Sequence, residues 1–257
     1  MEIYINIVFT MKRTIKILII FLLITVGFAT GNTNLQGASP VSKASKTEKF
    51  YIVDIKTTAG TISVKLYNQT PLHRDNFVKL CKNGNYNNVL FHRVIKEFMI
   101  QSGDPDSKQH EPGKLYGEGD LGYSLPAEFI PELFHKKGVL AAAREGDDVN
   151  PERRSSASQF YIVVGKKLDD TGFAKAEQRI RKALKDDSYT ISPEKREIYS
   201  TTGGTPHLDM QYTIFGEVVK GQEIVDSISL VKTDDNDRPV EDIWIISMEI
   251  QRRRFCH

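Results

Sequence analysis

Residues Phe91–Asp104 read Phe-His-Arg-Val-Ile-Lys-Glu-Phe-Met-Ile-Gln-Ser-Gly-Asp, and this stretch decides the fold. Two short runs with β-strand patterning, Val89–Ile95 and Phe98–Gln101, stand on either side of the polar pair Lys96-Glu97. Such a pair between two apolar runs predicts a tight connection between neighbouring strands.

The charged residue inside the first run is its most informative member. Strand alternation places Phe91, Arg93 and Ile95 on one face of the expected strand. A guanidinium stays charged at any working pH, so Arg93 needs an acceptor or an open cleft. Two interpretations stay open at this point: a structural arginine paired with a core carboxylate, and a functional arginine in a cleft.

Composition excludes several classes of protein. The chain has 257 residues and a formal net charge of +2, with acids and bases interspersed, which argues against a nucleic-acid or anionic-membrane surface. Cys81 is expected on an amphipathic helix as a small residue of the hydrophobic core, and two cysteines, Cys81 and Cys256, do not make a disulfide framework. The six histidines lack metal-ligand spacing, so we expect no metal and no cofactor. The basic residues at 252–257 are interpreted as a solvated tail.

The N-terminal part has the pattern of an export signal. A basic start at Met11 is followed by the apolar run Ile17–Ala29, which is typical of a secretory signal peptide with cleavage before Thr30. An uncleaved membrane anchor over residues 1–30 stays open as the alternative. Residues 31–48, rich in small and polar side chains, predict a flexible linker. The protein is therefore expected to be exported, periplasmic or secreted, with this segment as its only contact with a membrane.

The folded part, expected over residues 49–251, is mainly β. Thr70-Pro71 predicts the start of a short helix that ends near Gly84, and a second short helix is expected over Gln222–Ser229. Eight runs with strand patterning indicate a closed eight-stranded antiparallel β-barrel capped by these two α-helices. The eight expected strands are Lys49–Thr57, Thr61–Tyr67, Val89–Ile95, Phe98–Gln101, Lys137–Ala142, Ser158–Val164, Tyr212–Val219 and Ile243–Ile250.

Residues 166–206 do not fit the barrel pattern. Phe173–Leu184 is charged and periodic, and Ser192-Pro193-Glu194 has the chemistry of a helix start. The segment predicts a helical insertion between two barrel strands. A solvated excursion is the default interpretation, and docking of a specific partner is the alternative.

Four short motifs in order identify a family resemblance. Phe91-His-Arg-Val-Ile, Phe98-Met-Ile-Gln-Ser-Gly-Asp, Ser158-Gln-Phe-Tyr-Ile and Phe215-Gly-Glu-Val resemble the cyclophilin-type peptidyl-prolyl cis-trans isomerases. The resemblance covers roughly residues 50–250 and excludes 166–206. It implies an eight-stranded barrel with two capping helices, proline-containing polypeptides as substrates and no cofactor. We expect a monomer.

The resemblance also implies roles for individual residues. Arg93 matches the catalytic arginine, and Gln101 is expected to hold Arg93 or the substrate carbonyl. Ala143 and Arg144 match the loop that contacts the residue before proline. The expected proline pocket and its rim comprise Phe98, Met99, Gln101, Gln159, Tyr161, His207, Leu208 and Tyr212.

Four of these positions depart from the family pattern. The family usually has phenylalanine at Tyr161, tryptophan or phenylalanine at His207, histidine at Tyr212 and often asparagine at Arg144. Without the tryptophan, binding of cyclosporin is expected to be weak. The sequence thus predicts a prolyl isomerase that assists the folding of exported proteins. A binding or holdase module of the same fold, with a pocket narrowed by Tyr161 and His207, is the alternative.

Overall fold

The computed structural model describes residues 49–254. The predicted export segment and linker, residues 1–48, lie outside the described part, as do residues 255–257 with Cys256. None of the helices within residues 49–254 is long and apolar enough to cross a membrane.

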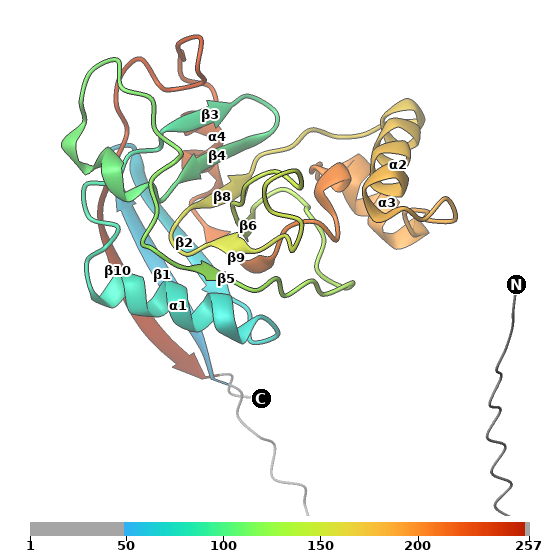
Figure 1. Cartoon of the computed structure of the whole chain (residues 1–257), viewed down its shortest axis with the longest axis horizontal. Helices are drawn as coiled ribbons and strands as arrows, with labels where there is room; N and C mark the ends of the chain where they lie inside the picture. Colours follow the sequence, from blue (N-terminus) through green and yellow to red (C-terminus); the bar gives the residue numbers. More distant parts are fainter. Residues whose placement is uncertain (1–48, 255–257) are drawn as a thin grey trace, which may run out of the picture. The chain divides into compact units, whose positions relative to one another are not determined.

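Within the described residues the chain forms a large sheet, a two-stranded ribbon, the helices α1 to α4 and two 3-10 turns (Figure 1). The strands are β1 (Lys49–Thr57), β2 (Gly60–Leu66), β3 (Arg93–Ile95), β4 (Met99–Ser102), β5 (Ser124–Leu125), β6 (Val139–Ala142), β7 (Ser155–Ser156), β8 (Phe160–Val163), β9 (Ile214–Lys220) and β10 (Ile245–Arg254). The α-helices are α1 (Pro71–Lys82), α2 (Asp170–Leu184), α3 (Pro193–Thr201) and α4 (Gln222–Ile228), with 3-10 turns η1 (Pro105–Gln109) and η2 (Pro206–Leu208).

Eight antiparallel strands form the large sheet in the order β10-β1-β2-β9-β6-β8-β4-β3. The segment before β3 meets the start of β10 through backbone hydrogen bonds, so the two edges of the curled sheet come together. Phe91 N donates to Ile243 O at 2.8 Å, and Ile245 N donates to Val89 O at 2.9 Å. The predicted eight-stranded barrel with two capping helices and a helical insertion is confirmed.

Helix α1 begins and ends close to the predicted residues, and it covers one end of the barrel with its apolar face. Pro71 occupies its first turn, and Phe77, Leu80 and Cys81 face the main hydrophobic core. Burial raises the pKa of the Cys81 thiol well above its usual range, so this cysteine behaves as an apolar core residue. Helix α4 contributes Val225 and Ile228 to the same core.

Two predictions on strand boundaries were wrong. Arg252–Arg254 are not a tail: they end strand β10 and pair with Lys49–Tyr51 of β1. The Arg252 guanidinium lies 5.9 Å from the centre of the Tyr51 ring. The second error concerns Phe91, which packs into the main core with Val94 and not on the face of Arg93. The strand begins only at Arg93, so the alternation does not extend back to Phe91.

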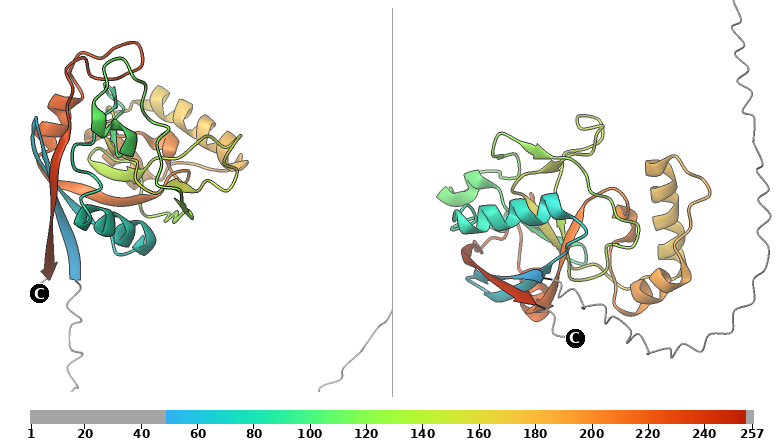
Figure 2. Two further views of the ribbon diagram at one scale, coloured as in Figure 1. Left: turned by 60° about the vertical axis from the view of Figure 1, so that its left-hand side comes forward. Right: turned by 90° about the horizontal axis from the view of Figure 1, so that it is seen from below.

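The predicted insertion is a pair of helices with a small core of its own. Helices α2 and α3 lie side by side at one end of the described unit (Figures 1 and 2). Asp169 caps α2 by accepting from Gly172 N, and Ser192 caps α3 by accepting from Lys195 N. Their apolar faces meet in a cluster of Phe173, Ala176, Ile180, Ile191 and Tyr199.

Candidate active site

Strands β4, β6 and β8 contribute apolar side chains to clusters on both of their faces, and one of these two faces carries the candidate site. Ile100, Leu140 and Ile162 point into the main core, while Met99 and Tyr161 belong to a second apolar cluster on the opposite face. The period-2 alternation predicted for residues 158–164 is therefore observed. That second face is the floor of a cleft of about 360 Å³, lined by His92, Arg93, Phe98, Met99, Gln101, Tyr116, Gly117, Glu118, Ala143, Arg144, Tyr161, Leu208 and Tyr212.

Arg93 lies at the rim of this cleft, on β3 opposite Gln101 of β4. Its side chain is 44% exposed, and its Nε lies 3.4 Å from Oδ2 of Asp237, which is exposed to a similar extent. The backbone holds Asp237 beside β3, because Val94 N donates to Asp237 O at 2.7 Å. The carboxylate beside Arg93 is therefore not a core residue, and the interpretation of Arg93 as an arginine buried against a core carboxylate is wrong.

Gln159 belongs to the support of the cleft and not to its lining. Its Nε2 donates to Gly117 O at 2.8 Å and to Gly119 O at 2.9 Å, and its Oε1 accepts from Gln101 Nε2 at 3.1 Å. The buried Asp104 carboxylate accepts from the backbone N–H groups of the same two glycines. One side chain thus holds the carbonyls of the loop and the other holds its amides.

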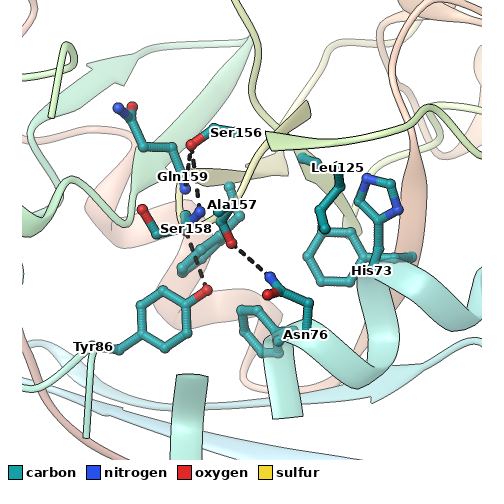
Figure 3. A pocket seen from close by; sticks show the side chains of 12 residues that line it. His73, Asn76, Tyr86, Leu125, Ser156, Ala157, Ser158 and Gln159 are labelled. Atoms are coloured by element: carbon teal, nitrogen blue, oxygen red, sulfur yellow. Dashed lines mark hydrogen bonds between the residues drawn. The ribbon is translucent and has the colours of Figure 1, made fainter. Parts of the chain in front are cut away.

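The turn before Gln159 is fixed from below by helix α1 and the loop that follows it (Figure 3). Asn76 Nδ2 donates to Ala157 O at 2.7 Å, and Tyr86 Oη donates to Ser158 O at 3.2 Å. Within the turn, Ser156 Oγ accepts from Gln159 N at 3.1 Å. Gln159 is therefore held by its backbone while its side chain reaches Gln101 and the glycine loop.

The family model described as cyclophilin type peptidyl-prolyl cis-trans isomerase/CLD matches residues 52–250. The chain belongs to this family. It is 35% identical over 195 residues to a Staphylococcus saprophyticus protein named as a peptidyl-prolyl cis-trans isomerase, a match that covers 76% of this chain and 88% of that protein.

Two further relatives show the range of the family. A Streptococcus pyogenes protein named as a bifunctional phosphatase/peptidyl-prolyl cis-trans isomerase is 35% identical over 201 residues; the match covers 77% of this chain but only 38% of that longer protein. The crystal structure of a Cryptosporidium parvum cyclophilin, determined in the presence of the dipeptide Ala-Pro, has a TM-score of 0.55 and 26% identity. That match covers 78% of this chain and 98% of the other.

Arg144, one of the departures from the usual cyclophilin pattern, has a side chain that is only 3% exposed. Its Nε donates to Gln211 O at 2.8 Å and one Nη to Glu145 O at 2.7 Å, and its guanidinium carbon lies 4.5 Å from the centre of the Tyr212 ring. An ion pair to Asp147 at 2.7 Å completes the set. The guanidinium is thus engaged within the protein, where it supports the Tyr212 wall of the cleft.

His207, a second departure, lies behind the wall. It is not one of the described residues that line the cleft. Its ring stacks on Phe98, with centroids 5.7 Å apart and planes inclined by 20°. Burial lowers the pKa of His207 to about 4, and the nearby Arg179 charge acts in the same direction. At neutral pH His207 is therefore an uncharged aromatic ring that supports Phe98.

Sequence reasoning missed several residues at this cleft. His92, Tyr116, Gly117 and Glu118 line it, and Asp237 contacts its arginine. His92 is part of the motif Phe91-His-Arg-Val-Ile and directly precedes Arg93, so its position next to a site residue was a usable signal. The other four come from loops without periodicity, where the sequence carries no pattern that predicts proximity.

Proposed function

We propose that the protein accelerates rotation about X-Pro bonds in exported polypeptides and that Arg93 stabilises the twisted amide. Cis-trans rotation takes tens of seconds because amide resonance opposes it by about 20 kcal/mol. Twisting localises the lone pair on the proline nitrogen, and a donor aimed at that nitrogen bonds more strongly in the twisted state than in the planar one. The position of a permanently charged arginine at the rim of a cleft with a partly apolar lining supports this role.

The apolar part of the cleft would hold the proline ring. Phe98, Met99, Tyr161 and Leu208 line it, and Met99 and Tyr161 are buried. Displacing water from this surface strengthens a charged hydrogen bond nearby because the local dielectric falls. A rate gain on the order of 10⁵ requires roughly 7 kcal/mol, which one charged bond together with anchoring of the ring can supply. The mechanism uses no nucleophile, metal or cofactor.

An isomerase assay on a short Ala-Pro peptide tests the role of Arg93. We expect R93A to lower kcat/KM by about 10²-fold, the usual effect of removing one preorganised donor. R93K, which keeps the charge but loses the planar donor set, should fall between R93A and the parent protein. R252A, which removes an exposed arginine from β10, is the matched control and should keep full activity. Unchanged turnover in R93A would show that the arginine has another role.

Export is supported by the sequence of residues 11–29, a basic start followed by an apolar run. Expression of the full chain, followed by cell fractionation and mass spectrometry of the product, tests this. We expect an exported protein whose mature chain begins at Thr30. A full-length product in the membrane fraction would identify an uncleaved anchor, and a full-length product in the cytosol would refute export.

A further inference from the structure

A chain of four buried side chains links the floor of the proline cleft to the helical insertion. Tyr161 Oη lies 2.9 Å from His135 Nε2, and His135 Nδ1 lies 3.0 Å from Asp209 Oδ1. Tyr199 of helix α3 donates to both oxygens of Asp209, at 2.9 and 2.8 Å. All four residues are at most 5% exposed. Buried polar groups of this kind specify one arrangement only when each is paired.

The direction of these hydrogen bonds follows from Asp209. Both the backbone N–H and Nδ1 of His135 face Asp209 Oδ1, so Nδ1 carries the ring proton and Nε2 accepts from Tyr161. Burial raises the pKa of Tyr161 and of Tyr199, so both phenols stay protonated and act as donors. The Tyr161 hydroxyl therefore points into the protein, and the ring is left to form an apolar cleft floor.

The insertion meets the barrel tightly at this chain. Thr205 N donates to His135 O at 2.8 Å, and a β-carbon at Gly204 would lie 2.3 Å from the same oxygen and 2.6 Å from the Tyr199 ring. The ring of Phe134, the residue before His135, packs edge-on against Tyr199 at a centroid distance of 5.4 Å. Any displacement of α3 would therefore change the positions of Asp209 and His135 directly, because both contact the insertion.

We infer that the helical insertion is a positioning element of the isomerase site. Tyr199 of the insertion acts through Asp209 and His135 of the barrel domain, and this chain of side chains fixes the ring of Tyr161 against the substrate proline. In this role Tyr199 acts on catalysis without touching the substrate. The inference rests on the proposed use of the cleft for proline. It differs from the two earlier interpretations of residues 166–206, a solvated excursion and a partner-docking module, because it gives the insertion a task in every turnover.

A double-mutant cycle on the full-length protein tests this, with kcat, KM and peptide Kd measured on one Ala-Pro peptide. We expect Y199F and Y161F each to lower kcat/KM by about threefold, and the double variant to be no worse than either, as for side chains in one network. I180V trims the insertion core without touching the chain, and it should keep kcat/KM within about 1.5-fold. H135Q, which breaks the chain in its middle, replaces Y199F in the cycle if that variant does not fold.

A spectroscopic readout separates positioning from general destabilisation. The ring resonances of Tyr161, assigned by comparison with Y161F, should shift in Y199F and stay in place in I180V. Two outcomes would overturn the inference. One is a loss of kcat/KM of about ninefold in the double variant, the product of the two single effects. The other is a Y199F protein with native activity and an unmoved Tyr161 resonance. A parent protein that binds the peptide without isomerising it would refute the proposed function alone, since the resonance and the Kd cycle still report the coupling.

Discussion

Replacing Gln159 with leucine should loosen the cleft without changing the residues that line it. The substitution removes three hydrogen bonds of a side chain that is 6% exposed: two to the carbonyls of Gly117 and Gly119, and one from Gln101. The Gly117–Gly119 loop would then keep its hydrogen bonds to Asp104, on its amide side, and lose those on its carbonyl side. Gln101, across from Arg93, would lose the partner that orients it.

The magnitude follows from the number and burial of these bonds. A net contribution of about 0.5–1.5 kcal/mol each gives about 1.5–4.5 kcal/mol for the three hydrogen bonds. The freed carbonyls lie in a partly exposed loop and regain water, and leucine buries apolar surface worth about 1–2 kcal/mol, so the net loss is about 1–2 kcal/mol. For a domain of this size that loss lowers Tm by about 2–8 °C. A displacement of the loop and of Gln101 should also lower kcat/KM by about tenfold, mainly through KM.

Thermal unfolding and the isomerase assay on Q159L and Q159E together identify which bond matters. Glutamate keeps the size of the side chain and an acceptor for Gln101 Nε2, but it turns an oxygen toward the carbonyls of Gly117 and Gly119 at neutral pH. If the loop contact positions the cleft, Q159E should be as impaired as Q159L; if the Gln101 contact does, Q159E should resemble the parent protein. A Q159L protein with unchanged Tm and kcat/KM would refute the reasoning altogether.

Three further predictions concern the same region. Burial lowers the pKa of His92 to about 4, below its ordinary value of 6.5, so protonation disfavours the native state. The free energy of unfolding should therefore fall as the pH drops from 6.5 to 4, and H92F should lack up to about 3 kcal/mol of that fall, as measured by urea unfolding at each pH. R144K should cost about 1–2 kcal/mol in urea unfolding and raise KM, because lysine cannot keep the two carbonyl bonds and the contact with the Tyr212 ring. G103A should be the most damaging, at more than about 3 kcal/mol in the same experiment, since its β-carbon would lie 2.2 Å from Ser158 O at a φ of +99°.

Local patterns were sufficient for the barrel and for much of the cleft. Alternation assigned Tyr161 to one face and Ile162 to the other, because the side-chain period of a strand is independent of tertiary contacts. The insertion was recognised because a helical period interrupts a β pattern. The same local rule failed at Arg252–Arg254: an edge strand can carry charges on exposed positions, and a run of arginines there looks like a tail.

Contacts between distant loops could not be predicted in the same way. Asp237 lies beside Arg93 across 144 residues, and Asp104 reaches Gly117 and Gly119 through a loop without any period. Such contacts depend on where loops return after the barrel has closed, and composition does not determine that. The bonds of Asp104 to the backbone N–H groups of Gly117 and Gly119 give this carboxylate a structural role.

The departures from the cyclophilin pattern bear on the choice between an isomerase and a binding module. A covered or narrowed pocket was the motive for the second. In the structure the Tyr161 hydroxyl turns away to His135, and its ring packs edge-on against Tyr212 with centroids 5.9 Å apart and planes inclined by 83°. His207 stacks behind Phe98, outside the lining, and the cleft keeps a volume of about 360 Å³. These unusual side chains therefore contact one another and the protein interior, so their presence is no argument for an inactive pocket, and peptide turnover decides between the two functions.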